Sequence, residues 1–181
     1  IYDSCAGSLR RLRSDYIDLY QLHGMPAGSN LEPAVGALRK LQADGKIRCF
    51  GISISATWHL ERLLALGGVA AAQVPFSLVN GTCLEALQLA AREQIGTLIK
   101  VPLGQGVLTG KYFASPAALD QADLRYQRFR RPEAAAALGK LAALRFLTKA
   151  SDAGGHTRTL PQAALRFVLD TEGVTSVIPG A

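Results

Sequence analysis

The fold is decided by the stretch Tyr16-Ile17-Asp18-Leu19-Tyr20-Gln21-Leu22-His23. Its nearly continuous apolar character predicts a parallel strand that is buried on both faces. The strand ends in a histidine, and in an α/β barrel the catalytic side chains lie at the carboxyl ends of the strands. His23 is therefore the first candidate for chemistry.

Helical and strand patterns alternate from this stretch outward over the whole chain. Such alternation predicts βα units with a parallel sheet, and it excludes all-β folds and simple helix bundles. An amphipathic helix is expected over residues 1–12, directly before the first strand. The five expected strands are residues 16–22, 47–52, 69–74, 97–101 and 174–178.

Capping residues indicate where the helices between these strands begin. A further helix is expected over 134–150. The interval 102–132 is long for a loop between a strand and a helix, which is typical of a functional loop. The expected N-caps are Asn30, Ser55, Thr82 with Glu85 as its capping-box partner, and Thr159 with Gln162.

The composition indicates one globular domain over residues 1–181. No apolar run approaches the roughly 20 residues that cross a membrane, and no secretory leader is present, so we expect a cytoplasmic protein without membrane contact. Cys5, Cys49 and Cys83 are isolated and lack metal-ligand spacing. We therefore expect reduced thiols and no metal site.

The net charge of +6 permits binding of nucleic acid or of a phosphorylated ligand. The densest basic segment lies in the long interval, and no nucleic-acid-binding motif accompanies it. We interpret it as solvated loop surface and expect no nucleic-acid partner. Its residues are Arg125, Arg128, Arg130 and Arg131, with Tyr126 and Phe129 between them.

Five buried strands form either an open doubly wound sheet or part of a closed barrel, because long apolar sheet edges invite aggregation. A doubly wound nucleotide fold has Gly-x-Gly-x-x-Gly after its first strand. The first strand here ends in Leu22-His23-Gly24-Met25-Pro26 instead. The barrel is favoured.

Five motifs, in order along the chain, resemble the aldo-keto reductase family. The first is Ser8 to Leu12 leading into Asp15-Tyr16-Ile17-Asp18-Leu19-Tyr20-Gln21-Leu22-His23. The others are Gly45-Lys46-Ile47-Arg48-Cys49-Phe50-Gly51-Ile52-Ser53, Gln73-Val74-Pro75-Phe76-Ser77-Leu78-Val79-Asn80, Pro102-Leu103-Gly104-Gln105-Gly106-Val107-Leu108-Thr109-Gly110-Lys111-Tyr112 and Ser176-Val177-Ile178-Pro179-Gly180-Ala181.

The resemblance implies a partial (β/α)8 TIM barrel made of the fourth to eighth strands, with the first three strands and the C-terminal tail outside this sequence. It implies carbonyl reduction with a Tyr as general acid, supported by Lys and Asp, and a His that orients the substrate carbonyl. Only the His carries over, onto His23. By itself, a histidine at a strand end is more often bonded to backbone. We expect that the 181-residue chain alone does not turn over.

The resemblance also implies the cofactor contacts. Ser53 and Gln73 match positions that hydrogen-bond the nicotinamide carboxamide, although Ile54 stands where the family often has Asn. Phe76 matches the aromatic residue under the nicotinamide, where the family commonly has Tyr; core packing is its alternative role. Residues that match the contacts to the cofactor phosphates are Leu103, Gly104, Gln105, Gly106, Leu108, Lys111 and Gly180.

The implied activity is reduction of a small-molecule aldehyde or ketone with NADP(H), the family's usual cofactor, or with NAD(H). A non-catalytic subunit or sensor that binds a nicotinamide nucleotide would use the same residues. Another phosphate-binding barrel enzyme is the third alternative. The sequence decides neither the substrate nor the oligomeric state.

Overall fold

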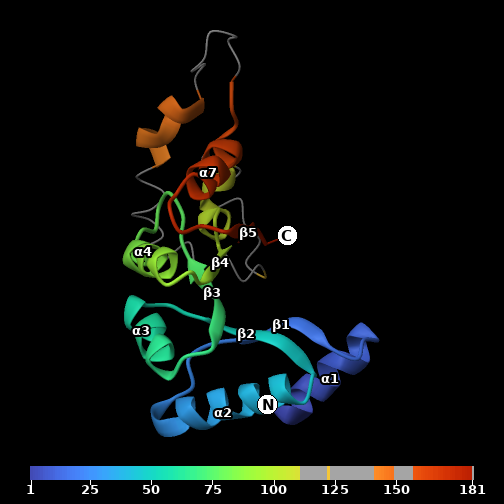
Figure 1. Ribbon diagram of the computed structural model, residues 1–181. Coiled ribbons are helices and arrows are strands. Elements are labelled where there is room, and N and C mark those ends of the chain that lie inside the picture. Colours follow the sequence, from blue (N-terminus) through green and yellow to red (C-terminus); the bar gives the residue numbers. More distant parts are fainter. Residues whose placement is uncertain (111–121, 123–140, 149–156, 181) are drawn as a thin grey trace. The chain divides into compact units, whose positions relative to one another are not determined.

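A computed structural model describes residues 1–110, 122, 141–148 and 157–180. Its helices and strands alternate as the sequence predicts (Figure 1). In chain order they are α1 (Tyr2–Leu12), β1 (Ile17–Leu22), the 3-10 helix η1 (Gly28–Asn30), α2 (Leu31–Ala43), β2 (Ile47–Ser53), α3 (Thr57–Leu66), β3 (Val69–Pro75), α4 (Leu84–Arg92), β4 (Gly96–Lys100), the 3-10 helices η2 (Gly104–Thr109) and η4 (Ala142–Thr148), α7 (Leu160–Leu169) and β5 (Ser176–Ile178).

The strands form one five-stranded sheet in the order β1-β2-β3-β4-β5. β1 pairs with β2, and β2 pairs with β3, both in parallel. The expected partial (β/α)8 barrel of βα units is confirmed. All five strands lie where the sequence predicts them, and no end differs by more than two residues.

The chain divides into two compact units. Unit 1 comprises Ile1–Pro75, Thr82–Ile99 and Glu172–Ser176, and unit 2 comprises Phe76–Gly81, Lys100–Thr171 and Val177–Ala181. The single domain over 1–181 stays a prediction. The expected helix over 134–150 and the basic segment around Arg128 lie largely outside the described residues.

β1 differs from its prediction. No residue of β1 is fully buried, and Asp18 is exposed, so the expectation of burial on both faces is wrong. β1 is an edge of the sheet, with β2 as its one neighbour in the described part of the chain. The helices α1 and α2 lie on one side of β1 and β2 (Figure 1).

Helix packing in unit 1 follows the predicted apolar faces. α2 buries Leu31, Ala34, Val35, Leu38 and Leu41, residues that recur at helical spacing. α1 buries Cys5 and ends at Arg13, which adopts a left-handed conformation with φ 52°. Burial raises the pKa of the Cys5 thiol, since the thiolate would lose its hydration.

The helix starts confirm part of the capping prediction. Asn30 is the N-cap of α2, and Thr159 forms the predicted capping box with Gln162 at α7. The other two predictions are wrong. α3 begins after Ala56, one residue later than the predicted cap, Ser55. The Ser55 N–H donates to Nδ1 of His59, at 3.2 Å. α4 begins after Cys83, one residue later than the predicted cap, Thr82.

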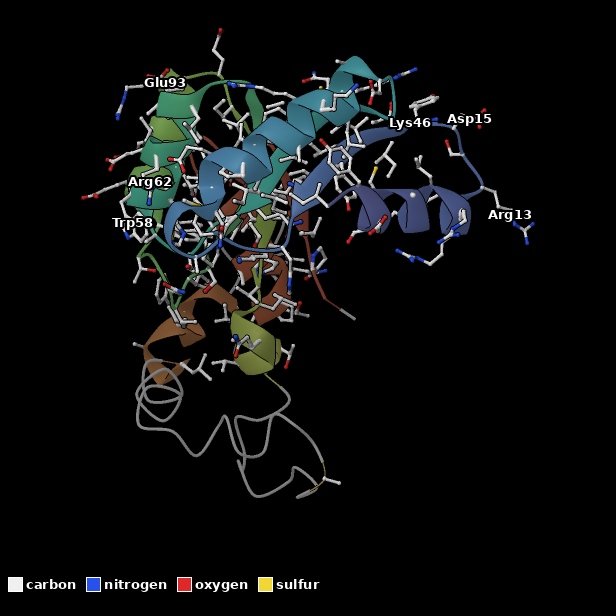
Figure 2. All side chains as sticks on the ribbon, turned by 90° about the horizontal axis from the view of Figure 1, so that it is seen from below. Arg13, Asp15, Lys46, Trp58, Arg62 and Glu93 are labelled. Atoms are coloured by element: carbon white, nitrogen blue, oxygen red, sulfur yellow. The ribbon has the colours of Figure 1, made fainter. Side chains whose placement is uncertain are left out.

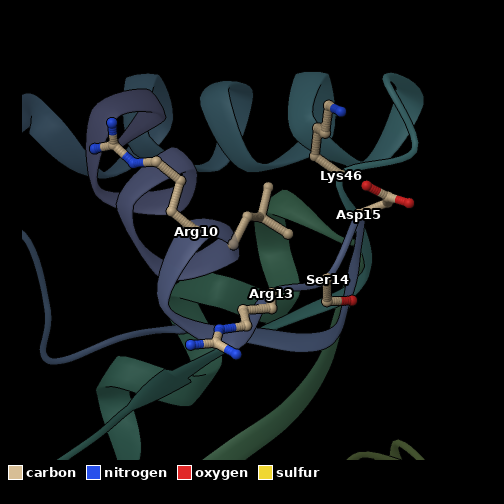
Figure 3. A pocket seen from close by; sticks show the side chains of 6 residues that line it. Arg10, Arg13, Ser14, Asp15 and Lys46 are labelled. Carbon is tan, nitrogen blue, oxygen red and sulfur yellow. The ribbon is translucent and has the colours of Figure 1, made fainter.

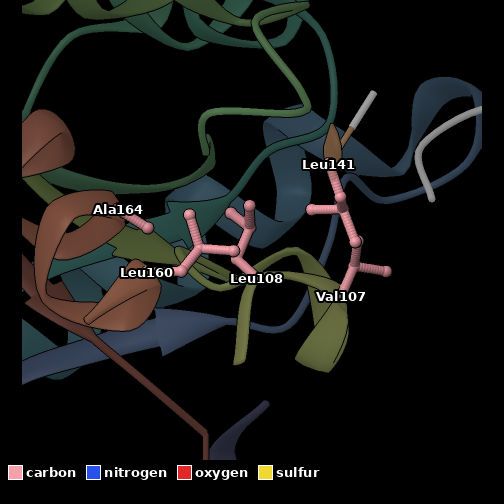
Figure 4. Close-up of a cluster of buried hydrophobic side chains, with 5 residues drawn as sticks. All are labelled: Val107, Leu108, Leu141, Leu160 and Ala164. Atoms are coloured by element: carbon pink, nitrogen blue, oxygen red, sulfur yellow. The ribbon is translucent and has the colours of Figure 1, made fainter. Parts of the chain in front are cut away.

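A second apolar cluster forms the core of unit 2 (Figure 4). It joins η2, α7 and the residues around η4. Leu78, Val79, Leu103 and Leu144 pack around it. Phe76 lies in the same unit, and its ring stacks on that of Phe167, with centroids 5.7 Å apart and planes 16° apart. The buried members of the cluster are Val107, Leu108, Leu141, Leu160 and Ala164.

Candidate active site at the carboxyl ends of the strands

The polar candidates of unit 1 lie at the carboxyl ends of β1, β2 and β3. Residues at paired register positions of a parallel sheet share a face. Gln21 pairs with Gly51, and Ser53 pairs with Gln73. Gly51 and Ser53 are two residues apart on β2, so all four residues share one face. The register therefore brings the predicted Ser53 and Gln73 together.

A bulge between β2 and β3 produces this pairing. Phe50 pairs with Val69, but the next residue, Gly51, pairs with Ala71, so β3 contains one extra residue. Without the extra residue, Ser53 would pair with Ala72, and Gln73 would lie one position further along. Because a one-residue shift turns side chains to the opposite face, the bulge is what sets Gln73 beside Ser53.

The carboxamides of Gln21 and Gln73 meet across β2. Gln73 Nε2 donates to Gln21 Oε1, at 2.7 Å. Gln21 Nε2 is buried and has no hydrogen-bond partner. A Cβ placed at Gly51 would lie 3.0 Å from Gln21 Nε2 and 2.4 Å from the carbonyl oxygen of Ala71. The glycine thus leaves the space through which the Gln21 side chain crosses the strand.

Tyr20, the neighbour of Gln21, faces the other way. It lies near Ser8 and Cys5 of α1, and burial raises the pKa of the phenol, with a smaller contribution from Cys5. β1 therefore alternates between a helix-facing phenol and an amide on the opposite face. The sequence analysis did not list Gln21, because it treated the strand as buried on both faces.

His23 follows β1 directly and is exposed. Its predicted place at the carboxyl end of the strand is confirmed, and its catalytic role stays a prediction. Ser53, the last residue of β2, is 6% exposed. Ile54 is fully buried, and its N–H donates to the carbonyl oxygen of Gln73, at 2.9 Å. This position, often Asn in the family, belongs to the apolar core here.

The glycine-rich loop of unit 2 has the backbone conformation that its sequence requires. Gly104, Gln105 and Gly106 all have positive φ, at 57°, 59° and 99°. Leu108 is fully buried in the apolar cluster, so its side chain holds the loop in place. A run of left-handed residues can turn several backbone N–H groups toward an anion.

The other residues predicted to contact the cofactor differ in their burial. Phe76 is 3% exposed, and its ring stacks on that of Phe167, so its predicted nicotinamide contact stays a prediction beside core packing. Lys111 lies outside the described residues. Gly180 is exposed, and a Cβ there would meet nothing within 4 Å.

The opposite end of the sheet carries a pocket that sequence reasoning missed (Figure 3). It has a volume of about 320 Å³. In Figure 3, the side chains of Arg10 and Arg13 extend away from those of Lys46 and Asp15. The charges therefore do not converge on one point. The lining residues are Leu9, Arg10, Arg13, Ser14, Asp15 and Lys46.

Charged side chains elsewhere on unit 1 also point outward. Figure 2 shows Arg13, Asp15 and Lys46 at one side of the molecule and Trp58, Arg62 and Glu93 at the other. Within the described ranges, no three His, Cys, Asp or Glu residues gather as metal ligands would. No described helix has both the length and the apolar character needed to cross a bilayer.

Comparison with known proteins identifies the family. The model of the aldo/keto reductase family matches residues 1–181. The chain belongs to the aldo/keto reductase family. It is 30% identical to the uncharacterized oxidoreductase YqkF of Bacillus subtilis (strain 168), over 100% of this chain and 56% of that protein. It is 38% identical to the aldo-keto reductase yakc of Schizosaccharomyces pombe, whose name specifies NADP(+), over 65% of this chain and 36% of that protein.

Solved aldo-keto reductases have the same fold. A glycerol dehydrogenase from Gluconobacter oxydans aligns with a TM-score of 0.80 and 26% identity, over 99% of this chain and 54% of that one. An aldo-keto reductase from Klebsiella pneumoniae in complex with NADPH aligns with a TM-score of 0.62 and 26% identity, over 97% of this chain and 52% of that one. The chain thus spans about half the length of these relatives.

Proposed function

We propose that this aldo/keto reductase chain binds the nicotinamide end of NADP(H) and contributes His23 to the reduction of an aldehyde or ketone. The observation that carries the proposal is the row of neutral polar groups at the carboxyl ends of β1 to β3. Ser53 and Gln73 are paired in register, and the Gln73 carboxamide is held by Gln21.

The donors and acceptors in this row suit a primary carboxamide. Ser53 has a hydroxyl that both donates and accepts, and Gln73 keeps an amide oxygen after its Nε2 is used. A neutral amide needs such neutral partners rather than charges. When bound, the nicotinamide would supply the hydride. In unit 2, we assign contacts to the cofactor phosphates to the backbone of 103–106 and to Lys111.

His23 would hold the substrate. An exposed imidazole at the end of β1 can donate a hydrogen bond from a ring N–H to a carbonyl oxygen. Such a bond orients the carbonyl and stabilises negative charge that develops on its oxygen. Because one similar structure is a glycerol dehydrogenase, small hydroxylated aldehydes are the first substrates to test.

We further propose that these 181 residues bind the cofactor without turning over. No tyrosine of the sequence matches the family's general acid, and Tyr20 lies near α1, on the face of β1 opposite Gln21. In line with its three free cysteines, we expect the protein in the cytoplasm.

The test is a fluorescence titration of the purified chain with NADPH and, separately, NADH. We expect saturable binding that favours NADPH. Replacing Gln73 by Leu should weaken it about tenfold, the loss of roughly one hydrogen bond of 1.4 kcal/mol. His23→Ala should leave it unchanged. Absorbance at 340 nm with DL-glyceraldehyde should show no reduction. Failure to bind either nucleotide would contradict the proposal.

A further inference from the structure

Burial of the Gln21 carboxamide costs free energy of folding. An unpaired buried amide donor costs roughly 1–3 kcal/mol, because it loses its hydration and gains no partner. Gln21 Nε2 is in this state, while the other end of the same carboxamide accepts the bond from Gln73. A methionine of similar length would fill the same space without that cost. The amide therefore needs a reason other than stability.

The hydrogen bond to Gln73 supplies a reason. Gln21 Oε1 accepts from Gln73 Nε2, at 2.7 Å, and this bond ties the end of the Gln73 side chain to β1. The Gln73 carboxamide is thereby held in one place on the face that it shares with Ser53. A polar group held in place loses less conformational freedom when it binds a ligand.

The backbone is arranged to let this contact form. The side chain of Gln21 crosses β2 above Gly51, where any Cβ would lie 3.0 Å from Nε2. The bulge at Phe50 and Gly51 then sets Gln73 on the same face. Two irregular features of the sheet, a residue without a side chain and an extra residue in β3, thus serve a single hydrogen bond.

We propose that Gln21 is a positioning residue, which holds the Gln73 carboxamide in place beside Ser53 so that it meets the primary amide of the ligand. The inference rests on the proposed function, since the amide in question is that of the nicotinamide. Gln21 acts through Gln73 and makes no ligand contact itself.

The test compares Gln21→Met, Gln21→Glu and Gln73→Leu in the full 181-residue chain. Gln21→Met removes both the unpaired donor and the acceptor for Gln73. We expect its thermal midpoint to change by less than about 2 °C, because the unpaired donor of Gln21 is removed while Gln73 Nε2 loses its acceptor. We expect its affinity for NADPH to fall about fivefold, close to 1 kcal/mol by the relation between affinity and free energy. If Gln21 had a purely structural role, Gln21→Met would lower the thermal midpoint and leave the affinity for NADPH unchanged.

Gln21→Glu serves as the rescue variant. Its carboxylate still accepts from Gln73 Nε2, so the affinity for NADPH should stay within about twofold of the unchanged chain. Gln88→Met, the same substitution at an exposed position of α4, is the matched control and should alter neither quantity.

The outcomes separate the two proposals. If Gln73→Leu leaves the affinity for NADPH unchanged, the proposed function fails at that residue. If Gln73→Leu weakens binding while Gln21→Met does not, the role of Gln21 is overturned and the proposed function stands. Loss of affinity in Gln21→Glu equal to that in Gln21→Met would also overturn it, because the acceptor would then be irrelevant.

Discussion

The two ends of the β1–β3 sheet differ in the kind of interaction that they hold. At the amino end, Arg48 pairs with Asp18 at 3.0 Å and lies over the Tyr16 ring, 4.2 Å from its centroid. Both charged side chains are more than half exposed, at 62% and 73%. At the carboxyl end, two neutral carboxamides share a bond next to a glycine with no space for a side chain.

The contrast matches the general pattern of (β/α)8 barrels. Residues at the carboxyl ends of the strands serve function, and residues at the amino ends serve stability. It also predicts which changes matter. Water weakens the exposed ion pair, so its loss costs little. The carboxyl end is packed against backbone atoms, which cannot move aside, so small additions there cost much more.

The largest effect is expected from Gly51→Ala. The added Cβ would lie 2.4 Å from the carbonyl oxygen of Ala71, a backbone atom. We expect a loss of about 3 kcal/mol in the free energy of unfolding, the upper range for overpacking. Urea denaturation measures it. Gly36→Ala, at a helical glycine with open space around it, is the control and should stabilise the chain by about 0.5–1 kcal/mol. An equal response at both glycines would remove the case for a closely packed carboxyl end.

Thr97→Val tests whether burial or position along the strand determines how much free energy of unfolding a substitution removes. Thr97 lies near the amino end of β4 but is fully buried, and it exchanges two hydrogen bonds with Thr175, of 3.0 and 2.9 Å. Valine keeps the shape and leaves the Thr175 N–H without its acceptor. We expect a loss of about 2 kcal/mol in the free energy of unfolding.

Thr157→Val, at an exposed position, is the control for Thr97 and should change the same quantity by less than about 0.5 kcal/mol. If the two variants lose similar free energies of unfolding, then position along the strand, rather than burial, determines the loss at the amino end.

Arg48→Met tests the exposed ion pair at the amino end of the sheet. The aliphatic part of the side chain is kept, and the ion pair and the cation–π contact are lost. We expect a loss below about 1 kcal/mol that shrinks further in 1 M salt. A double-mutant cycle with Asp18→Asn isolates the pair. A coupling above about 2 kcal/mol would contradict the comparison, since that size is typical of desolvated charges.

The sequence predicted the fold because βα alternation and apolar spacing are local signals. The five strands, the face of α2 and the capping box at Thr159 all followed from residues close together in the chain. The start of α3 did not, because the helix begins after Ala56 rather than at the predicted cap, Ser55, whose N–H donates to the His59 ring.

The candidate site was less predictable for a similar reason. The places of His23, Ser53 and Gln73 at strand ends follow from strand limits alone. The bond between Gln21 and Gln73 joins residues 52 positions apart and depends on the bulge at Gly51. A bulge in a parallel pair of strands has no sequence signature in this chain that we identify, and without it the register would set Ser53 beside Ala72.

The smallest effect concerns the two faces of β1. Burial raises the pKa of Tyr20 above its ordinary value of about 10, so folding favours the neutral phenol. The stability from this preference is fully present below the ordinary pKa and is lost as the pH rises through the higher pKa of the folded state. The free energy of unfolding should therefore fall more steeply above about pH 10 in the unchanged chain than in Tyr20→Phe, and urea denaturation at several pH values measures this. Because Tyr20 faces α1 and Gln21 faces the opposite side, Tyr20→Phe should leave the affinity for NADPH unchanged. A loss of affinity in Tyr20→Phe would show that the two faces of the strand are coupled.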